Sequence, residues 1–258
     1  MKLGQHFLMD CDAIVRIASY AELKPEDRVL EIGPGPGNLT EALASRAGQV
    51  YAVEIDPDLA AGLSGRFSNV QVINGDALKV ELPHCNKIVS NLPYQISSKI
   101  TYRLLSRPFE TAVLMYQWEF ARRMAATAGS EEYGRLAMTV GFFCRIEILE
   151  KVSKMAFRPV PQVDSAVVRL KPRSDRPKVD PANFIRLAEG LFNNRRKKVK
   201  KGLAALGAGR LALAELDGAL LDRRPEELTP DEAASLVGAI TRKSDSNNSR
   251  QLLGESAS

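Results

Sequence analysis

The sequence predicts an α/β domain with a mostly parallel sheet, followed by a small domain made only of helices. Apolar strand-like runs alternate with helical patterns through the first half of the chain, which is typical of a parallel sheet with helices on both faces. Two strand-like runs near 145–152 and 165–172 then follow without a crossover helix between them, so we expect an antiparallel or mixed edge. Beyond residue 180 only helical patterns remain.

The expected elements of the α/β part follow in chain order. A polar segment opens the chain and leads into a helical pattern that ends near residue 20. Strands are expected at 28–32, 49–55, 70–74, 87–90, 111–116, 145–152 and 165–172. Helices are expected at about 38–46, 57–66, 97–105, 117–128 and 134–143.

A change in composition after residue 170 predicts the domain boundary. The stretch KPRSDRPKVD is charged and holds two prolines, as linkers often do. Helices are then expected at about 181–192, 197–206, 211–220 and 230–241. Thr229 and Pro230 make a strong helix start. We therefore expect an α/β domain at 1–172, a linker at 173–180, a helical domain at 181–242 and a disordered tail at 243–258.

Composition excludes several classes of protein. No apolar run is long enough to span a membrane, and the first residues lack the apolar stretch of a signal peptide, so we expect a cytoplasmic protein without a membrane partner. The three cysteines, Cys11, Cys85 and Cys144, are widely spaced, which argues against a disulfide framework or a metal site. A net charge of +5 fits a polyanionic partner without proving one.

Polar groups stand where successive strands are expected to end. Gly33 and Gly35 belong to a GxGxG turn that lacks the spacing of dinucleotide folds and suits S-adenosylmethionine better; a turn without ligand is the alternative. Glu54 can accept hydrogen bonds from both hydroxyls of a ribose. Asp76, with the Ala77 backbone beside it, can accept from an adenine amino group, although such a residue is more often a turn or cap.

The turn Asn91-Leu92-Pro93-Tyr94 ends the fourth of these strands. Adenine N6 is a poor nucleophile because its lone pair is delocalised into the ring. The Asn91 side-chain oxygen and a carbonyl of Leu92 or Pro93 can accept the N6 hydrogens, and the Tyr94 ring can stack on the base. A plain β-turn is the alternative interpretation.

Two further segments point to a nucleic acid. Phe157 precedes a proline-rich loop that can hold its ring for stacking on an extruded base, although a core position is the more usual role of such a residue. The run from Arg195 to Lys201 has six basic residues in seven and predicts RNA contact, the alternative being a solvated helix face. Its basic residues are Arg195, Arg196, Lys197, Lys198, Lys200 and Lys201.

Taken in order, GQHFL, EIGPGPGNLT, VEID, GDAL, NLPYQISS, QWEFARRM, FRPVPQVDSAVV and FNNRRKKVKKGL make the chain resemble the KsgA-type rRNA adenine N6,N6-dimethyltransferases. The resemblance implies a class I, Rossmann-like S-adenosylmethionine-dependent methyltransferase domain and a helical RNA-recognition domain. It implies that two adjacent adenines in the 3′-terminal hairpin loop of small-subunit rRNA are each methylated twice, within a late pre-small-subunit particle. Bacterial members usually carry asparagine where this chain has the histidine of GQHFL. At this position the sequence therefore resembles the archaeal branch of the family.

The same resemblance implies roles for individual residues. Asn91, Leu92 and Tyr94 would handle the target amine, and Phe157 would stack on the adenine. The residues it assigns to the cofactor are His6, Leu8, Gly33, Glu54, Asp76 and Asn91.

Other functions remain open at this stage. The nearest alternative is dimethylation of a large-subunit adenine, as in the macrolide-resistance relatives. An assembly factor that binds the subunit without catalysis is another. A DNA adenine methylase fits less well because those sites more often read (D/N)PPY. Nothing in the sequence suggests an obligate oligomer, so we expect a monomer.

Overall fold

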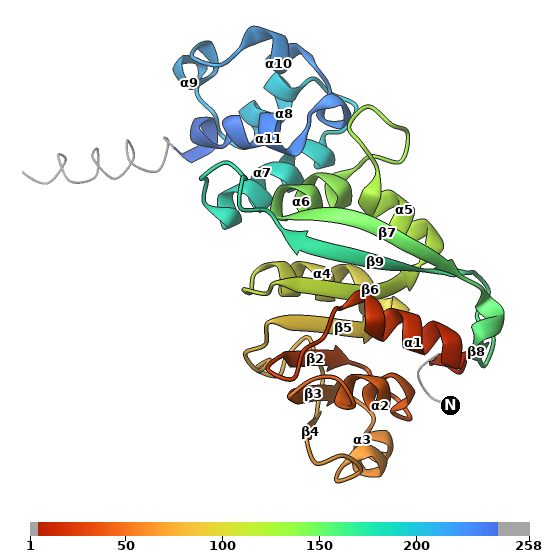
Figure 1. Cartoon of the computed structure of the whole chain (residues 1–258). Helices are drawn as coiled ribbons and strands as arrows, with labels where there is room; N and C mark the ends of the chain where they lie inside the picture. Colours follow the sequence, from red (N-terminus) through yellow and green to blue (C-terminus); the bar gives the residue numbers. More distant parts are fainter. Residues whose placement is uncertain (1–4, 242–258) are drawn as a thin grey trace, which may run out of the picture. The chain divides into compact units, whose positions relative to one another are not determined.

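The computed structural model describes residues 5–241 of the chain (Figure 1), and these form two compact units. The first unit contains the described residues up to Ala125 and the segment Cys144–Pro172. The second contains Ala126–Phe143 and the described residues from Arg173 onward. The tail expected at 243–258 lies outside the described residues.

The division differs from the sequence-based boundaries at one segment. Residues 126–143 were expected within the first domain, but they pack with the helices that follow residue 172. Aromatic stacking joins this segment to the second unit: the rings of Phe142 and Phe184 stack with their centroids 3.8 Å apart. Residues 173–180 contain no helix or strand, yet Arg173 pairs with Asp231 at 2.8 Å, which fixes this segment to the second unit.

The first unit is built on a seven-stranded sheet in the order β4-β3-β2-β5-β6-β9-β7. The strands from β2 to β6 run parallel, and β9 pairs antiparallel with both β6 and β7, which confirms the expected antiparallel edge. The strands are β2 (Arg28–Ile32), β3 (Gln49–Glu54), β4 (Val70–Asn74), β5 (Lys87–Asn91), β6 (Thr111–Gln117), β7 (Cys144–Val152) and β9 (Ser165–Pro172).

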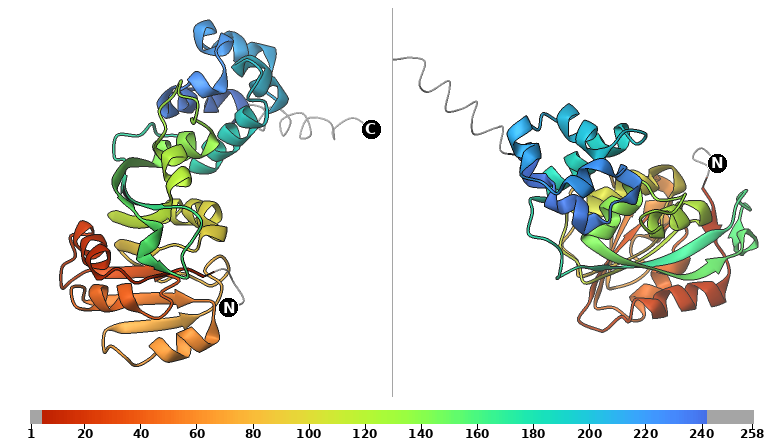
Figure 2. Two further views of the ribbon diagram at one scale, coloured as in Figure 1. Left: turned by 90° about the vertical axis from the view of Figure 1, so that its right-hand side faces the viewer. Right: turned by 90° about the horizontal axis from the view of Figure 1, so that it is seen from above.

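Helices cover both faces of this sheet. Alternate strand residues such as Val29, Val89 and Val113 form one apolar cluster with α1 and α2. Helix α4, whose Ile100 and Leu104 are buried, lies on the other side of the sheet (Figure 2). The helices of the unit are α1 (Cys11–Tyr20), α2 (Asn38–Ala44), α3 (Pro57–Leu63), α4 (Ser97–Leu105) and α5 (Trp118–Ala125), with short 3₁₀ turns at Tyr94–Ile96 and Lys154–Ala156.

Two short strands lie outside the main sheet. β1 (Phe7–Leu8) pairs antiparallel with β8 (Phe157–Arg158), so that Leu8 stands opposite Phe157. The Met9 N–H donates to the Ala156 carbonyl at 2.8 Å and extends this pairing. The N-terminal segment is therefore fixed against a loop more than one hundred residues away in the sequence.

The second unit has its own core, to which Phe184, Leu187 and Leu203 contribute fully buried side chains. Thr229 caps α11 reciprocally with Glu232, as its sequence predicted. The helices are α6 (Arg135–Phe143), α7 (Pro181–Asn193), α8 (Val199–Ala205), α9 (Arg210–Ala214), α10 (Gly218–Asp222) and α11 (Pro230–Ser235), with a 3₁₀ turn at Pro225–Glu227. Across residues 5–241, no helix has both the length and the apolar character needed to cross a bilayer.

Candidate active site

A pocket lies in the first unit at the carboxyl ends of the parallel strands. The chain runs outward from β2 to β4 in one direction and from β5 to β6 in the other, so β2 and β5 flank the point where strand order reverses. Only Val29 and Leu30 of β2 pair with β5, and the Ser90 hydroxyl, which donates to the Ile32 carbonyl at 2.6 Å, then bridges the two strands. Their ends open into the pocket.

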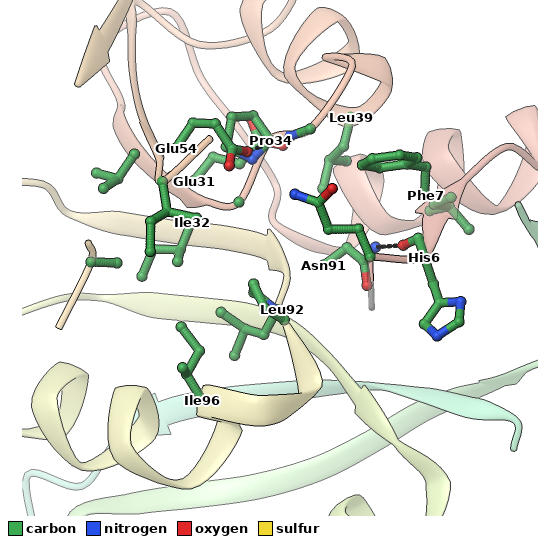
Figure 3. Close-up of a pocket in the computed structure, with 18 of the residues that line it drawn as sticks. His6, Phe7, Glu31, Ile32, Pro34, Leu39, Glu54, Asn91, Leu92 and Ile96 are labelled. Carbon is green, nitrogen blue, oxygen red and sulfur yellow. Dashed lines mark hydrogen bonds between the residues drawn. The ribbon is translucent and has the colours of Figure 1, made fainter. Parts of the chain in front are cut away.

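The pocket brings the predicted strand-end residues together. Strands β2, β3, β4 and β5 contribute the turns that hold them, and the N-terminal segment forms the remaining wall (Figure 3). The predicted residues that line it are His6, Leu8, Gly33, Gly35, Glu54, Asp76, Ala77, Asn91, Leu92, Pro93 and Tyr94.

The glycine turn after β2 needs glycine for two separate reasons. Gly33 and Gly35 have φ of 69° and 58°, in the left-handed region. A Cβ at Gly35 would lie 2.8 Å from the Phe7 ring, and one at Gly33 would lie 3.1 Å from Cγ of Pro93. The turn is thus approached closely by both the N-terminal segment and the Asn91 turn, which leaves room for backbone and ligand but not for side chains.

Glu54 holds the glycine turn in place. Its side chain is only 2% exposed. One carboxylate oxygen accepts from the Gly35 N–H and the other from the Asp56 N–H, both at 3.0 Å. Each oxygen keeps a further lone pair that can accept from a hydroxyl group. Asp56, which directly precedes Pro57, caps α3 by accepting from the backbone N–H groups of Asp58 and Leu59.

Asp76 and Ala77 contribute the end of β4. Asp76 Oδ1 accepts from the Leu78 N–H at 2.9 Å, so this carboxylate also closes its own turn. The turn interpretation and the site interpretation of Asp76 are therefore compatible, because one oxygen holds the loop while the half-buried residue lines the pocket.

The turn after β5 presents an amide and an aromatic ring. Asn91 Nδ2 donates to the His6 carbonyl at 3.5 Å, so its donor side is engaged and Oδ1 is the atom available as an acceptor. The Pro93 carbonyl already accepts from the Ile96 N–H at 3.2 Å and from the Ser97 hydroxyl at 3.5 Å. Of the two carbonyls considered from the sequence, these contacts favour Leu92 as the second acceptor.

Tyr94 is anchored by a residue of β9, which lies two strands along the sheet from β5. Its hydroxyl forms a 2.7 Å hydrogen bond with the Ser165 hydroxyl at the start of β9. Burial raises the pKa of the Tyr94 phenol, an effect that the bond to Ser165 opposes. The ring is therefore a fixed, neutral surface in the pocket wall.

Phe157 does not line this pocket. Its side chain is 0% exposed and belongs to the apolar cluster that includes Leu8, Ile14 and Val152. Pairing of β8 with β1 turns the ring into the core. It cannot stack on a base in the pocket while it stays in that core.

Sequence reasoning missed Glu31, which also lines the pocket. It is 1% exposed, and Oε2 has no hydrogen-bond partner among the described residues. Burial raises the pKa of its carboxyl group to about 8; Glu54 adds to the rise, and the Thr40 hydroxyl opposes it. The available signal was an acid between the apolar residues Leu30 and Ile32 of a predicted buried strand. The structure also adds Phe7, which covers Gly35.

The basic run lies in the second unit and is not one helix. Residues 194–197 form a turn after α7, and α8 begins only at Val199, which is buried. Three of the six basic side chains are paired with acids: Arg195 with Glu226 at 3.1 Å, and Lys198 and Lys200 with Asp222 at 3.3 and 2.7 Å. Among residues 5–241 no ion pair is formed by the other three, Arg196, Lys197 and Lys201, which are exposed.

Comparison with known proteins identifies the family. A family model described as ribosomal RNA adenine dimethylase matches residues 1–240. The chain belongs to this family. As a member, it is an S-adenosylmethionine-dependent rRNA adenine dimethyltransferase with a class I methyltransferase fold. Membership confirms the resemblance seen in the sequence motifs.

Two relatives within the rRNA adenine dimethylase family are similar over nearly their full length. The chain is 46% identical over 248 residues to the Methanosarcina mazei protein named "Probable ribosomal RNA small subunit methyltransferase A", covering 92% of this chain and 91% of that one. It is 42% identical to the Pyrococcus furiosus protein of the same name, covering 91% and 89%. Both organisms are archaea, in agreement with the archaeal type that the histidine in GQHFL indicates.

Two solved structures share the fold of this family member. A dimethyladenosine transferase from Plasmodium falciparum superposes with a TM-score of 0.83 at 29% identity, covering 92% of this chain and 98% of that one. The 23S rRNA methyltransferase ErmE superposes with a TM-score of 0.70 at 35% identity, covering 91% and 99%. The fold is therefore shared with one protein named as a dimethyladenosine transferase and with another named as a 23S rRNA methyltransferase.

Proposed function

We propose that the protein dimethylates N6 of two adjacent adenines in the 3′-terminal hairpin loop of small-subunit rRNA, within a pre-small-subunit particle late in assembly. The observation that supports this most strongly is the placement of the Asn91 turn beside the glycine turn in one pocket. The names of the archaeal relatives support the choice of subunit. We further propose that it acts as a monomer in the cytoplasm, where such particles assemble.

The pocket residues fit S-adenosylmethionine. Glu54 keeps lone pairs for the ribose hydroxyls, and the backbone beside Gly33 and Gly35 is open to close approach because a side chain there would clash. Asp76 and Ala77 line the same pocket and would contact the adenine ring of the cofactor. Glu31 offers a buried, unpartnered oxygen that a positively charged group can satisfy. When bound, the cofactor supplies an electrophilic methyl group on a sulfonium.

The Asn91 turn supplies the acceptors for the target amine. Asn91 Oδ1 and the Leu92 carbonyl accept the two N6 hydrogens, which draws the nitrogen toward tetrahedral geometry and frees its lone pair for attack. Tyr94, held by Ser165, limits movement of the base. After one transfer the amine still has one hydrogen, so the same acceptors can hold it for the second. The N6 proton is released to water, directly or past Asn91.

The basic run supports an RNA partner. Arg196, Lys197 and Lys201 add three exposed, unopposed charges near the first turn of α8, where the helix dipole is unfavourable for cations. Phosphate oxygens offset both the mutual repulsion and the dipole, and they bind such charges in a salt-dependent manner.

A large-subunit adenine is the second candidate substrate. The observation that favours it is the similarity to ErmE, which is named as a 23S rRNA methyltransferase. A particle-binding factor without catalysis fits less well, because the pocket keeps its full set of strand-end residues.

Transfer of labelled methyl groups tests the proposal. The full chain is incubated with labelled S-adenosylmethionine and either pre-small-subunit or pre-large-subunit particles from a strain that lacks the modification. We expect up to four methyl groups per small-subunit particle and primer-extension stops at two adjacent adenines near its 3′ end. Label in the large-subunit rRNA alone would contradict the proposed substrate, and label in neither would contradict the proposed activity.

A further inference from the structure

Five leucines of the second unit lie outside its core. They belong to residues 210–222, which we call the leucine segment. The sequence predicted one helix at 211–220, but the segment forms two short helices, α9 and α10, with a turn between them. Neither helix contributes a buried residue, and Leu211 is 85% exposed. The five leucines, none of them buried, are Leu211, Leu213, Leu216, Leu220 and Leu221.

The neighbouring helices of the same unit behave differently. Helix α7 buries Phe184, Leu187 and Leu191, and α8 buries Val199 and Leu203. Helix α10 packs against α8, whereas α9 packs extensively against no other helix or strand of the described residues (Figure 1). Leucine side chains are stabilised by leaving water, so a group of them at the surface of a folded unit marks an interaction site.

The leucine segment is attached to the basic run. Asp222, its last residue, pairs with Lys198 at 3.3 Å and with Lys200 at 2.7 Å. Directly after it, the Arg223 carbonyl accepts from the Val199 N–H at 2.8 Å. The leucines therefore border the residues that support RNA binding, and a partner that covers them lies next to bound RNA.

The charge of the leucine segment favours a protein as this partner. The segment holds three acids, Glu215, Asp217 and Asp222, and one base, Arg210, within a chain of net charge +5. Glu215 and Asp217 are exposed, and within residues 5–241 Asp217 forms no ion pair. Phosphates would be repelled by these acids and would offer the leucines no apolar surface. A basic protein with apolar side chains complements both features.

We propose that the leucine segment docks on a basic protein of the small-subunit particle, beside the rRNA that the basic run contacts. Proteins that lie on rRNA carry positive charge because they neutralise its phosphates, which gives them the charge that the segment requires. This inference rests on the proposed function, which puts the chain on such a particle. It adds a protein contact to recognition by RNA charge.

Leu211→Ser tests the contact with little risk to the fold, because the Leu211 side chain is 85% exposed. Val15→Ser is the matched control, since Val15 is an aliphatic residue of α1 that is 51% exposed and lies outside the leucine segment. Affinity of the full chain is measured by filter binding, across a salt series, for purified pre-small-subunit particles and for protein-free small-subunit rRNA. Thermal unfolding verifies that each variant is folded.

We expect Leu211→Ser to weaken binding to the particles about fivefold or more, the effect of removing an apolar anchor from a protein interface. Its affinity for protein-free rRNA should stay within about twofold of wild type, and its salt dependence should not change because no phosphate contact is lost. Val15→Ser should bind both ligands within about twofold of wild type. Wild-type binding of Leu211→Ser to the particles, or an equal loss of affinity for protein-free rRNA, would overturn the inference.

Cross-linking identifies the partner. The full chain, with a photoreactive amino acid in place of Leu211, is bound to the purified particles and irradiated, and the product is analysed by mass spectrometry. A cross-link to a basic protein of the particle is expected. A cross-link instead to rRNA, to a second copy of the chain or to residues 242–258 of the same chain would contradict the proposal.

Failure of this inference differs from failure of the proposed function. If the wild-type chain methylates the particles while Leu211→Ser binds them as wild type does, only the docking contact is wrong. If the wild-type chain neither binds nor methylates the particles, the proposed function fails and the inference falls with it.

Discussion

The pocket of the first unit and the basic run of the second show two different ways of placing functional groups. In the pocket, polar side chains are held by backbone groups: Glu54 by Gly35 and Asp56, Asn91 by the His6 carbonyl. In the basic run, half of the charges are held by acidic side chains of the same unit, namely Glu226 and Asp222.

The difference shows that a held side chain can still bind a ligand when its structural partner leaves one of its donor, acceptor or charged atoms available. Glu54 and Asn91 keep acceptor capacity after their bonds to the backbone are made. Asp222 partly neutralises the charges of Lys198 and Lys200. These two lysines should therefore attract a phosphate less strongly than Arg196 and Lys197 do. Positions in the basic run should therefore differ in their contribution to RNA affinity, although the sequence makes them look equivalent.

Charge neutralisation within the basic run gives the larger of two effects that sharpen this comparison. Arg196→Gln with Lys197→Gln should weaken binding to small-subunit particles about tenfold or more at low salt, because two phosphate contacts are lost. The slope of log affinity against log salt concentration should fall by roughly 1.5 to 2. Filter binding across a salt series measures both quantities.

Two matched double variants serve as controls for that experiment. Lys198→Gln with Lys200→Gln removes the same charge from paired positions and should change affinity and slope less. Lys24→Gln with Lys178→Gln removes it from two exposed lysines outside the run and should change them least. Equal losses in all three would mean that only net charge matters and that the pairing with Asp222 has no consequence.

The smaller effect concerns Glu31 and the stability of the pocket. Burial raises the pKa of the Glu31 carboxyl to about 8 from an ordinary value of 4.5. Between these two values the folded chain binds a proton that the unfolded chain releases, so Glu31 makes stability fall as pH rises. Glu31→Gln removes this dependence. The melting temperature of the variant minus that of wild type should therefore increase by about 2 °C or more when the pH is raised from 5 to 8.

Thermal unfolding at pH 5, 6.5 and 8 in the absence of cofactor measures this difference. Glu26→Gln, at an exposed acid just before β2, is the control and should show no such trend. A pH dependence in Glu31→Gln that runs parallel to that of wild type would show that Glu31 does not ionise over this range.

The sequence predicted most of the sheet and of the pocket because local patterns determine both. The strands at 28–32 and 70–74 and the helix at 97–105 have the predicted bounds. The pocket residues could be found because parallel strands bring their carboxyl ends to one edge, so that residues read in order along the chain meet in space.

Features that depend on distant pairing could not be predicted in this way. The Phe157 ring is buried because β8 pairs with β1, which lies at the other end of the first unit's sequence. The run from Arg195 to Lys201 looks continuous, but its first residues form a turn, and its pairing with Glu226 and Asp222 involves helices later in the chain. Glu31 owes its raised pKa to burial, which a sequence does not display.

In the proposed mechanism, the Asn91 turn supplies the acceptors for the target amine, and other residues of the pocket hold the cofactor. Asn91→Ala tests this directly, with Asn183→Ala as a control at an asparagine of the second unit. Cofactor affinity is measured by calorimetry, and methylation of pre-small-subunit particles in single turnover. We predict that Asn91→Ala binds S-adenosylmethionine within a few-fold of wild type but transfers methyl groups about 100-fold more slowly, because the amine loses one of its two acceptors. Near-normal methylation by Asn91→Ala would contradict the account.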